Sequence, residues 1–353
     1  MNTTKRLWQI RPIIFFIGLL MVIAGYAPIE AAEAGKEVKY EAGFYYTIKK
    51  GDTLWDISQR FEDTPWQWPD LWSKNVQIPN PHWIYPGQRI RLFRKSEVER
   101  EQPPAKLPAV VPKVETTVSP KKPKPEVYFL YSEMDKVGFI RKPPVEPHGI
   151  IFKVLEDKKL ISIDDILYIR SPQANKLSEL TPGSLWTIYR TLAPTNNRRS
   201  EASIGTQHLI LGIAQITQKE SQYAMAKVVK AFRAIRLDDL LMPYVPHSPE
   251  ITVRPSPPGM EGEIIGGEDH TQMMADHFVV FIDKGQVDNI MPGQIFDIYY
   301  QEKAALGSGG PQVTLKPVNI GTLVVLHTEK TTSTCYITKS SRKIVPGQKF
   351  HTP

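Results

Sequence analysis

The second half of the chain contains many short stretches rich in hydrophobic residues, several of them alternating with polar ones. Residues 163–169 and 278–282 are rich in β-branched and aromatic side chains, and residues 185–189 and 295–299 alternate with a period of two after a Pro-Gly pair. Such stretches are typical of β-strands. Further strands are predicted at 209–216, 223–229, 321–326 and 334–338. Residues 224–241 also allow a helix, but the matching residues 331–334 favour a strand, which we predict.

These predicted strands belong to two similar segments. Four sets of residues recur in one order and at nearly one offset: Gly149 with Gly262, Pro182-Gly183 with Pro292-Gly293, Gly212 with Gly321, and Ile235 with Ile344. We therefore predict two copies of one small domain at about 149–243 and 262–350, each a mainly-β barrel or sandwich of about five strands. The predicted domains are 127–243 with its lead-in, a Pro-rich connector at 244–261, and 262–350.

The pattern changes near the N-terminus, where residues 45–92 predict strand, helix, helix and strand. Leu54, Ile57 and Phe61 recur at helical spacing, and Thr53 precedes them as an N-cap. A second helix is predicted from about Pro69 to Asn75, with Leu71 and Trp72 facing inward. Pro86-Gly87 suits the central positions of a type II turn before the last strand. The prediction is a compact βααβ module.

This module resembles LysM, a family that binds glycans containing N-acetylglucosamine, such as peptidoglycan and chitin. The resemblance rests on Gly51-Asp52-Thr53-Leu54-Trp55-Asp56-Ile57 and on the run from Asn80-Pro81 to Tyr85-Pro86-Gly87-Gln88, and it covers about 45–92 only. It implies that the sugar lies between the loop after the first strand and the loop before the last. The implied glycan-binding residues are Gly51, Asp52, Thr53, Leu54, Asn80, Pro81, Trp83, Ile84 and Tyr85. The alternative is that these residues merely cap a helix and form a turn; we favour glycan binding.

Five of the seven tryptophans lie in this module: Trp55, Trp66, Trp68, Trp72 and Trp83. A small domain needs large apolar side chains in its core, so some of them must be buried. We expect Trp55 and Trp72 to be buried. Trp83 lies beside the implied sugar site and is the best candidate for stacking on a sugar ring.

The first residues predict export. Lys5, Arg6 and Arg11 precede an apolar run that is shorter than a comfortable membrane span, and small residues follow it. We predict a signal peptide at 1–34, with cleavage after Ala34 or Ala31; an uncleaved anchor is the alternative. The mature chain is then expected to contain no transmembrane span. Residues 93–126 are rich in Pro and Lys and predict an extended linker.

Composition adds little that is specific. The net charge of +7 is scattered, and the sequence has neither zinc-ligand spacing nor a recognisable nucleic-acid-binding motif, so we expect no nucleic-acid partner. The sole cysteine, Cys335, aligns with Ala226 and is expected to be a small buried residue. His270 and His277, with Asp269 and Asp276, could ligate a metal ion, but their spacing is not typical of zinc sites. We predict no catalytic residue, metal or cofactor.

These observations predict a non-enzymatic exported protein of the periplasm or cell envelope. It would bind peptidoglycan through the LysM-like module and present tandem β-domains to a protein partner whose identity the sequence does not give. The alternative is a peptidoglycan-remodelling enzyme with a β-class catalytic domain that the sequence does not reveal.

Overall fold

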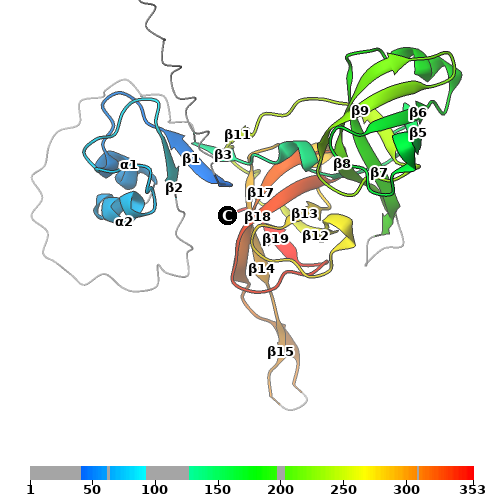
Figure 1. Ribbon diagram of the computed structural model, residues 1–353. Helices are drawn as coiled ribbons and strands as arrows, with labels where there is room; N and C mark the ends of the chain where they lie inside the picture. The colour runs from blue at the N-terminus through cyan, green and yellow to red at the C-terminus, as the bar shows by residue number, and fades with distance from the viewer. Residues whose placement is uncertain (1–40, 62–63, 93–126, 197–202, 308–309) are drawn as a thin grey trace, which may run out of the picture. The chain divides into compact units, whose positions relative to one another are not determined.

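The computed structural model (Figure 1) describes residues 41–61, 64–92, 127–196, 203–307 and 310–353. The predicted signal peptide at 1–34 and the predicted linker at 93–126 lie outside these ranges. An N-terminal module containing both helices and strands is followed by a mainly-β region with barrel-like sheets. Within the described ranges, no helix combines the length and the apolar character that a membrane crossing requires.

The N-terminal module has the order strand, helix, helix, strand that the sequence predicts. Its elements are β1 (Gly43–Thr47), α1 (Leu54–Phe61), the 3-10 helix η1 (Pro65–Gln67), α2 (Trp68–Ser73) and β2 (Arg89–Leu92). Strands β1 and β2 are antiparallel. The helices cover one face of this pair, because Leu54, Ile57 and Leu71 are buried with Tyr46 and Ile90 in one cluster. Helix α2 begins one residue before Pro69 and ends at Ser73 rather than Asn75.

Two further strands extend the sheet of this module. Strand β3 (Val127–Leu130) pairs with the free edge of β1, and β11 (Glu250–Thr252) pairs with β3, so the strand order is β11-β3-β1-β2. The rings of Phe44 and Phe129 meet edge to face at 5.1 Å between centroids. The lead-in assigned to the first β-domain and the predicted connector at 244–261 therefore each supply a strand to the N-terminal sheet.

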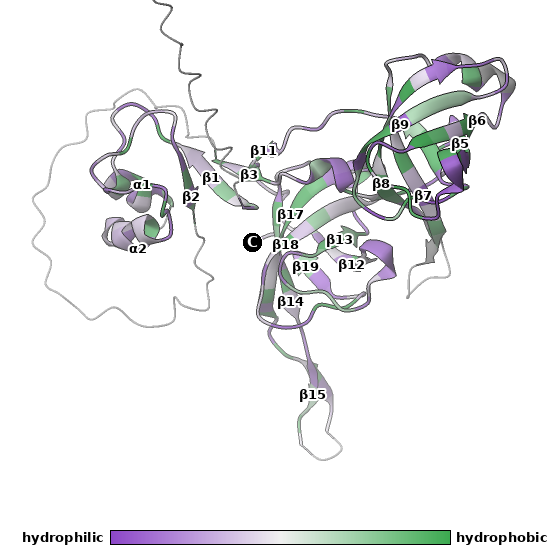
Figure 2. Ribbon diagram, in the orientation of Figure 1, coloured by the Kyte–Doolittle hydropathy of each residue, from purple (hydrophilic) through white to green (hydrophobic). Residues whose placement is uncertain are grey.

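The first β-domain is a ring of six strands. Its elements are β5 (Gly149–Val154), β6 (Ile166–Arg170), β7 (Leu185–Asn196), β8 (Ser203–Lys219), β9 (Ala224–Ala231) and β10 (Leu240–Pro243). The order β5-β6-β9-β8-β7-β10 closes on β5, and β4 (Phe139–Arg141) adds to the outer edge of β8. The strand prediction for 224–241 is confirmed at Ala224–Ala231. Figure 2 shows hydrophobic residues following the strands of this barrel.

The second β-domain is a closed barrel of six strands. Its elements are β12 (Glu261–Gly267), β13 (Val279–Ile282), β14 (Ile295–Tyr300), β17 (Val318–Thr328), β18 (Ser333–Ser340) and β19 (Lys349–His351). The order β12-β13-β18-β17-β14-β19 matches that of the first barrel strand for strand. The sequence predicted about five strands in each copy and gave ranges for four of them; β5 and β10 of the first barrel, and β12 and β19 of the second, lie outside those ranges.

Matching core residues occupy matching positions in the two barrels. Trp186 lies two residues before Ile188, which pairs with Gly212, and Phe296 lies two residues before Ile298, which pairs with Gly321. Both aromatic side chains are buried, in separate clusters of hydrophobic residues. Ala226 and Cys335 also correspond, since they pair with Leu167 and Val280. Burial raises the pKa of the Cys335 thiol.

Tight turns with glycine at the third position begin β2, β7, β14 and β19. The turns are Tyr85-Pro86-Gly87-Gln88, Thr181-Pro182-Gly183-Ser184, Met291-Pro292-Gly293-Gln294 and Val345-Pro346-Gly347-Gln348. Each glycine has φ between +87° and +90°, and the fourth N–H donates to the first carbonyl. Proline then glycine at the central positions is typical of type II turns. This turn type was predicted for Pro86-Gly87, and the structure confirms it there.

The remaining elements are short. Strands β15 (Lys303–Ala305) and β16 (Gln312–Thr314) form a hairpin between β14 and β17. Within the described ranges, strands are also connected by the 3-10 turns η3 (Met134–Lys136), η4 (Leu155–Asp157), η5 (Ala174–Glu179), η6 (Glu268–His270) and η7 (Gln286–Asp288).

Candidate glycan-binding site

The two loops that the sequence singled out are joined by backbone hydrogen bonds at Ile48, just after β1. The Ile48 N–H donates to the carbonyl of Gln88 at 2.8 Å, and the Gly87 N–H donates to the carbonyl of Ile48 at 2.8 Å. The loop after β1 and the turn before β2 are thus fixed against each other. The predicted site residues Asn80 to Tyr85 lie immediately before that turn.

The loop after β1 is built around the carboxylate of Asp52. It accepts hydrogen bonds from the Tyr46 hydroxyl at 2.6 Å and the Lys49 N–H at 2.8 Å, and it lies 3.7 Å from the Arg60 guanidinium. Burial, followed by the hydrogen bond to Asp52, raises the pKa of Tyr46 to about 12. Because the carboxylate is engaged by these three groups of the module, the Asp52 side chain shapes the loop after β1.

The next residues form the start of α1. The Thr53 hydroxyl accepts the Asp56 N–H at 3.1 Å and donates to the Asp56 carboxylate at 2.7 Å, which confirms the predicted N-cap. Gly51 and Thr53 are exposed, whereas Leu54 is buried in the core of the module. The Leu54 side chain therefore packs in the core of the module and does not face solvent.

The second loop carries the exposed aromatic side chains. Trp83 and Tyr85 are 58% and 59% exposed, whereas Pro81 and Ile84 are half-buried and Ile84 packs on the module's core. The Asn80 side chain accepts the His82 N–H at 2.9 Å, and its carbonyl accepts the Trp83 N–H at 2.9 Å. These bonds hold the loop in one conformation that presents Trp83 outward.

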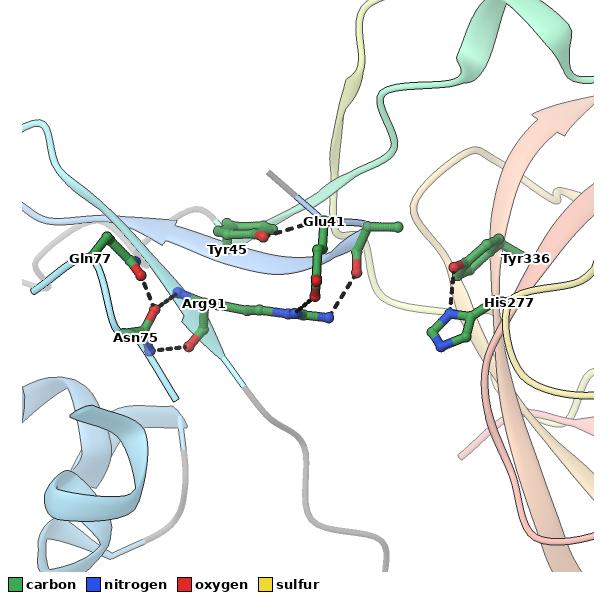
Figure 3. A network of polar contacts seen from close by, with 8 residues as sticks. Glu41, Tyr45, Asn75, Gln77, Arg91, His277 and Tyr336 are labelled. Atoms are coloured by element: carbon green, nitrogen blue, oxygen red, sulfur yellow. Dashed lines mark hydrogen bonds and ion pairs between the residues drawn. The ribbon is translucent and has the colours of Figure 1, made fainter. Parts of the chain in front are cut away.

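Asn75, which the sequence did not mark as a site residue, joins the two elements that flank this loop. Its side-chain amide is buried and donates to the carbonyls of Leu71 at 2.7 Å and Arg91 at 3.0 Å, and its oxygen accepts the Arg91 N–H at 2.7 Å. Figure 3 shows the hydrogen bonds between Asn75 and Arg91, together with the Gln77 amide and the ion pair between Arg91 and Glu41. Asn75 thereby ties the end of α2 to β2. The available signal was its position at the end of the second predicted helix, which in the structure ends at Ser73.

The burial of the tryptophan side chains differs from the sequence prediction. Trp55 was expected to be buried, but it is 39% exposed and meets Trp66 edge to face at 4.8 Å. It lies on the outer side of α1, because the inner side is filled by Leu54, Ile57 and Ser58. Trp72 is half-buried, and its indole N–H donates to the carbonyl of Ile78 at 2.8 Å.

The histidines considered as metal ligands lie in turns of the second barrel. His277 has φ of 70°, and its Nδ1 lies 2.7 Å from the hydroxyl of Tyr336 (Figure 3). Among the residues that the structure describes, no group of three or more His, Cys, Asp or Glu side chains is arranged to hold a metal ion.

Comparison with known proteins identifies the class of the N-terminal module. The module has two adjoining loops on a βααβ scaffold, and one of these loops carries exposed aromatic rings. Residues 46–93 match the LysM domain family. These residues form a LysM domain, which implies binding of peptidoglycan or a related glycan and is typical of cell-wall-associated proteins.

A relative of this segment is known. The chain is 36% identical over 58 residues to the uncharacterized protein YqbP of Bacillus subtilis (strain 168), a match that spans 13% of this chain and 26% of that protein. The similarity is confined to the LysM segment.

Proposed function

We propose that this chain is a non-enzymatic exported protein of the periplasm or cell envelope that binds peptidoglycan through its LysM domain and presents two β-barrels to an envelope partner protein. The observation that carries the glycan-binding part is the pair of fixed loops at Ile48, with Trp83 and Tyr85 exposed beside them. Backbone amides and carbonyls of the loops would hold the N-acetyl group, and Trp83 would cover a sugar face. A single shallow module of this kind is expected to bind with micromolar to millimolar affinity, roughly 4 to 8 kcal/mol.

We also propose that the two barrels are copies of one domain. The identical strand order, the corresponding positions of Trp186 and Phe296, and those of Ala226 and Cys335 support this. The raised pKa and complete burial of Cys335 disfavour a role as a nucleophile, because a reactive cysteine needs a thiolate that substrate can reach. The enzyme alternative has no specific observation in its favour. A cleared band in a zymogram of purified sacculi would support the enzyme alternative.

Binding to purified sacculi tests the proposal. Trp83→Ala should weaken co-sedimentation with sacculi by roughly fivefold, about 1 kcal/mol, because the exposed ring no longer stacks on a sugar. Trp66→Ala is the matched control: its side chain is the more exposed, at 76%, but it belongs to η1 and not to the two loops. Equal weakening by both variants, or by neither, would contradict the assignment of the site.

Export is tested separately. The mature protein should begin near Gly35 and be recovered from the periplasm, as N-terminal sequencing would establish. An intact Met1 in the membrane fraction would favour the uncleaved anchor.

A further inference from the structure

One outer face of the first barrel is unusually aromatic. Phe152, Tyr168 and Tyr223 form a three-ring cluster with centroids 5.8 to 6.4 Å apart. Phe152 is 40% exposed, Met225 lies beside Tyr168 across the strand pair, and Glu220 precedes Tyr223 in the turn between β8 and β9. We call these five residues the β6–β9 face. Among the described residues, Glu220 has no cationic partner.

The second barrel has a face that corresponds to it residue by residue. Tyr168 pairs with Met225 in the first barrel, as Phe281 pairs with Thr334 in the second. The turn glutamates also correspond. Their N–H groups donate to equivalent carbonyls, from Glu220 to Tyr223 at 2.8 Å and from Glu329 to Thr332 at 2.9 Å.

The side chains next to these glutamates correspond as well. The Gln218 amide donates to the carboxylate of Glu220 at 2.6 Å, and His327 Nε2 lies 3.0 Å from that of Glu329. The two faces therefore share one backbone geometry and one carboxylate position.

In the second barrel this face is occupied by β4, the short strand with the sequence Phe139-Ile140-Arg141. The Arg141 guanidinium makes a two-pronged ion pair with Glu329, at 2.8 and 3.0 Å. The hydroxyls of Thr332 and Thr334 donate to the carbonyls of Ile140 and Gly138, at 2.6 and 2.8 Å.

The contact with β4 buries the side chains of this face of the second barrel. Thr332, Thr334 and Phe281 are each only 1% exposed, whereas their counterparts Tyr223, Met225 and Tyr168 are all half-buried. The same backbone geometry is thus covered by an extended segment in one barrel and open in the other.

We propose that the β6–β9 face binds an extended segment of a partner protein that carries an arginine next to a hydrophobic residue, as β4 does on the second barrel. The arginine would pair with Glu220 and lie over the tyrosine rings, where a guanidinium is also attracted to the ring faces. The hydrophobic neighbour would rest on Phe152 and Met225. This inference rests on the proposed role of the barrels in binding a partner, and it specifies the chemistry of that partner.

The probe is the chain's own segment 136–142, Lys-Val-Gly-Phe-Ile-Arg-Lys, made as a fluorescent peptide with a photoreactive benzoylphenylalanine in place of Phe139. Added to the full mature chain and irradiated, it should crosslink to residues 152–168 and 218–225. Glu220→Gln and Tyr223→Ala should each weaken peptide binding at least fivefold. Glu261→Gln, which changes an exposed carboxylate of β12, should leave it unchanged. A peptide with glutamate in place of Arg141 should not bind.

Crosslinks confined to the second barrel, or peptide binding unaffected by Glu220→Gln, would overturn the proposal. Sedimentation velocity supplies an independent outcome: a dimer that Tyr223→Ala abolishes would identify a second copy as the occupant and would also overturn it. Binding to sacculi is measured in parallel on the same protein. If the chain binds sacculi but not the peptide, this inference alone is contradicted. If it binds the peptide but not sacculi, only the glycan-binding proposal is contradicted.

Discussion

At the scale of single residues, the conformation of the LysM loop after β1 depends on the largely buried carboxylate of Asp52. Tyr46, Lys49 and Arg60 all converge on the carboxylate of Asp52, whose side chain is 11% exposed. The sequence marked Asp52 as a ligand residue because of its place in the LysM pattern. It did not indicate Tyr46 or Arg60, since their contact with Asp52 exists only once β1 and α1 are folded together.

Asp52→Ala should therefore act mainly on stability. The change leaves the buried Tyr46 hydroxyl and the Lys49 N–H without their acceptor, which is expected to cost about 1–3 kcal/mol. Urea denaturation of the LysM segment 41–92, followed by tryptophan fluorescence, would measure it. A variant as stable as the parent that nevertheless fails to bind sacculi would show that the carboxylate contacts the glycan directly.

His208 gives the first barrel a dependence on pH. Its ring is buried, stacks on Phe139 at 4.6 Å and accepts the Val145 N–H at Nε2, and burial lowers its pKa to about 4. The ordinary value in an unfolded chain is about 6.5. Below pH 6.5 the unfolded chain binds a proton that the folded barrel excludes. Stability is thus complete above pH 6.5 and falls toward pH 4, by up to about 3 kcal/mol.

His208→Gln tests this dependence, because glutamine can still accept the Val145 N–H but does not titrate. Denaturation midpoints measured from pH 7 to pH 4 should fall more steeply for the parent chain than for the variant. Parallel pH profiles would show that the pKa of His208 is the same in the folded and the unfolded chain.

At the scale of elements, two of the Pro-Gly turns offer a matched pair of substitutions. Gly183 and Gly293 have nearly the same φ, +88° and +90°, but different surroundings. A Cβ on Gly183 meets no atom within 4 Å, whereas one on Gly293 would lie 2.0 Å from the carbonyl oxygen of Thr252. Gly183→Ala should therefore cost only the strain of a positive φ, roughly 1–2 kcal/mol.

Gly293→Ala should in addition displace β11 and its neighbour Arg254, whose N–H donates to the Gly293 carbonyl at 3.0 Å. Amide hydrogen exchange is a direct measurement, because displacement of the segment frees the Arg254 N–H from the Gly293 carbonyl. Exchange of this N–H should be faster in Gly293→Ala than in Gly183→Ala. Equal rates in the two variants would indicate that β11 does not depend on this contact.

Local patterns explain which elements the sequence could predict. Helix α1, the strands that begin at Leu185 and Ile295, and the turn at Pro86-Gly87 are encoded by neighbouring residues, so propensity and periodicity were sufficient. The pairing of β3 with β1, and of β11 with β3, joins residues far apart in the chain. Nothing in either short strand indicates its partner. The exposed position of Trp55 was missed for a related reason, because aromatic character alone does not give the side of a helix.

At the scale of the whole molecule, the LysM domain is part of a larger sheet than its own two strands provide. Tyr45 and Tyr128 stack on one face of that sheet at 6.2 Å, and Phe44 meets Phe129 on the other. An isolated LysM segment ending at Leu92 would lose both contacts and the hydrogen bonds between β1 and β3. The predicted site residues all lie within 51–85, so their prediction did not require knowledge of this larger sheet.

The central claim is that the two loops joined at Ile48 bind a glycan. The most direct test is a titration of the ¹⁵N-labelled mature chain with an N-acetylglucosamine oligomer, observed by nuclear magnetic resonance. The backbone N–H signals of 51–54, Asn80 and 82–85 and the indole N–H of Trp83 should shift at micromolar to millimolar ligand. The indole of Trp72, which is hydrogen bonded to Ile78, should not shift. No shifts at millimolar oligomer, or shifts confined to the barrels, would contradict the account.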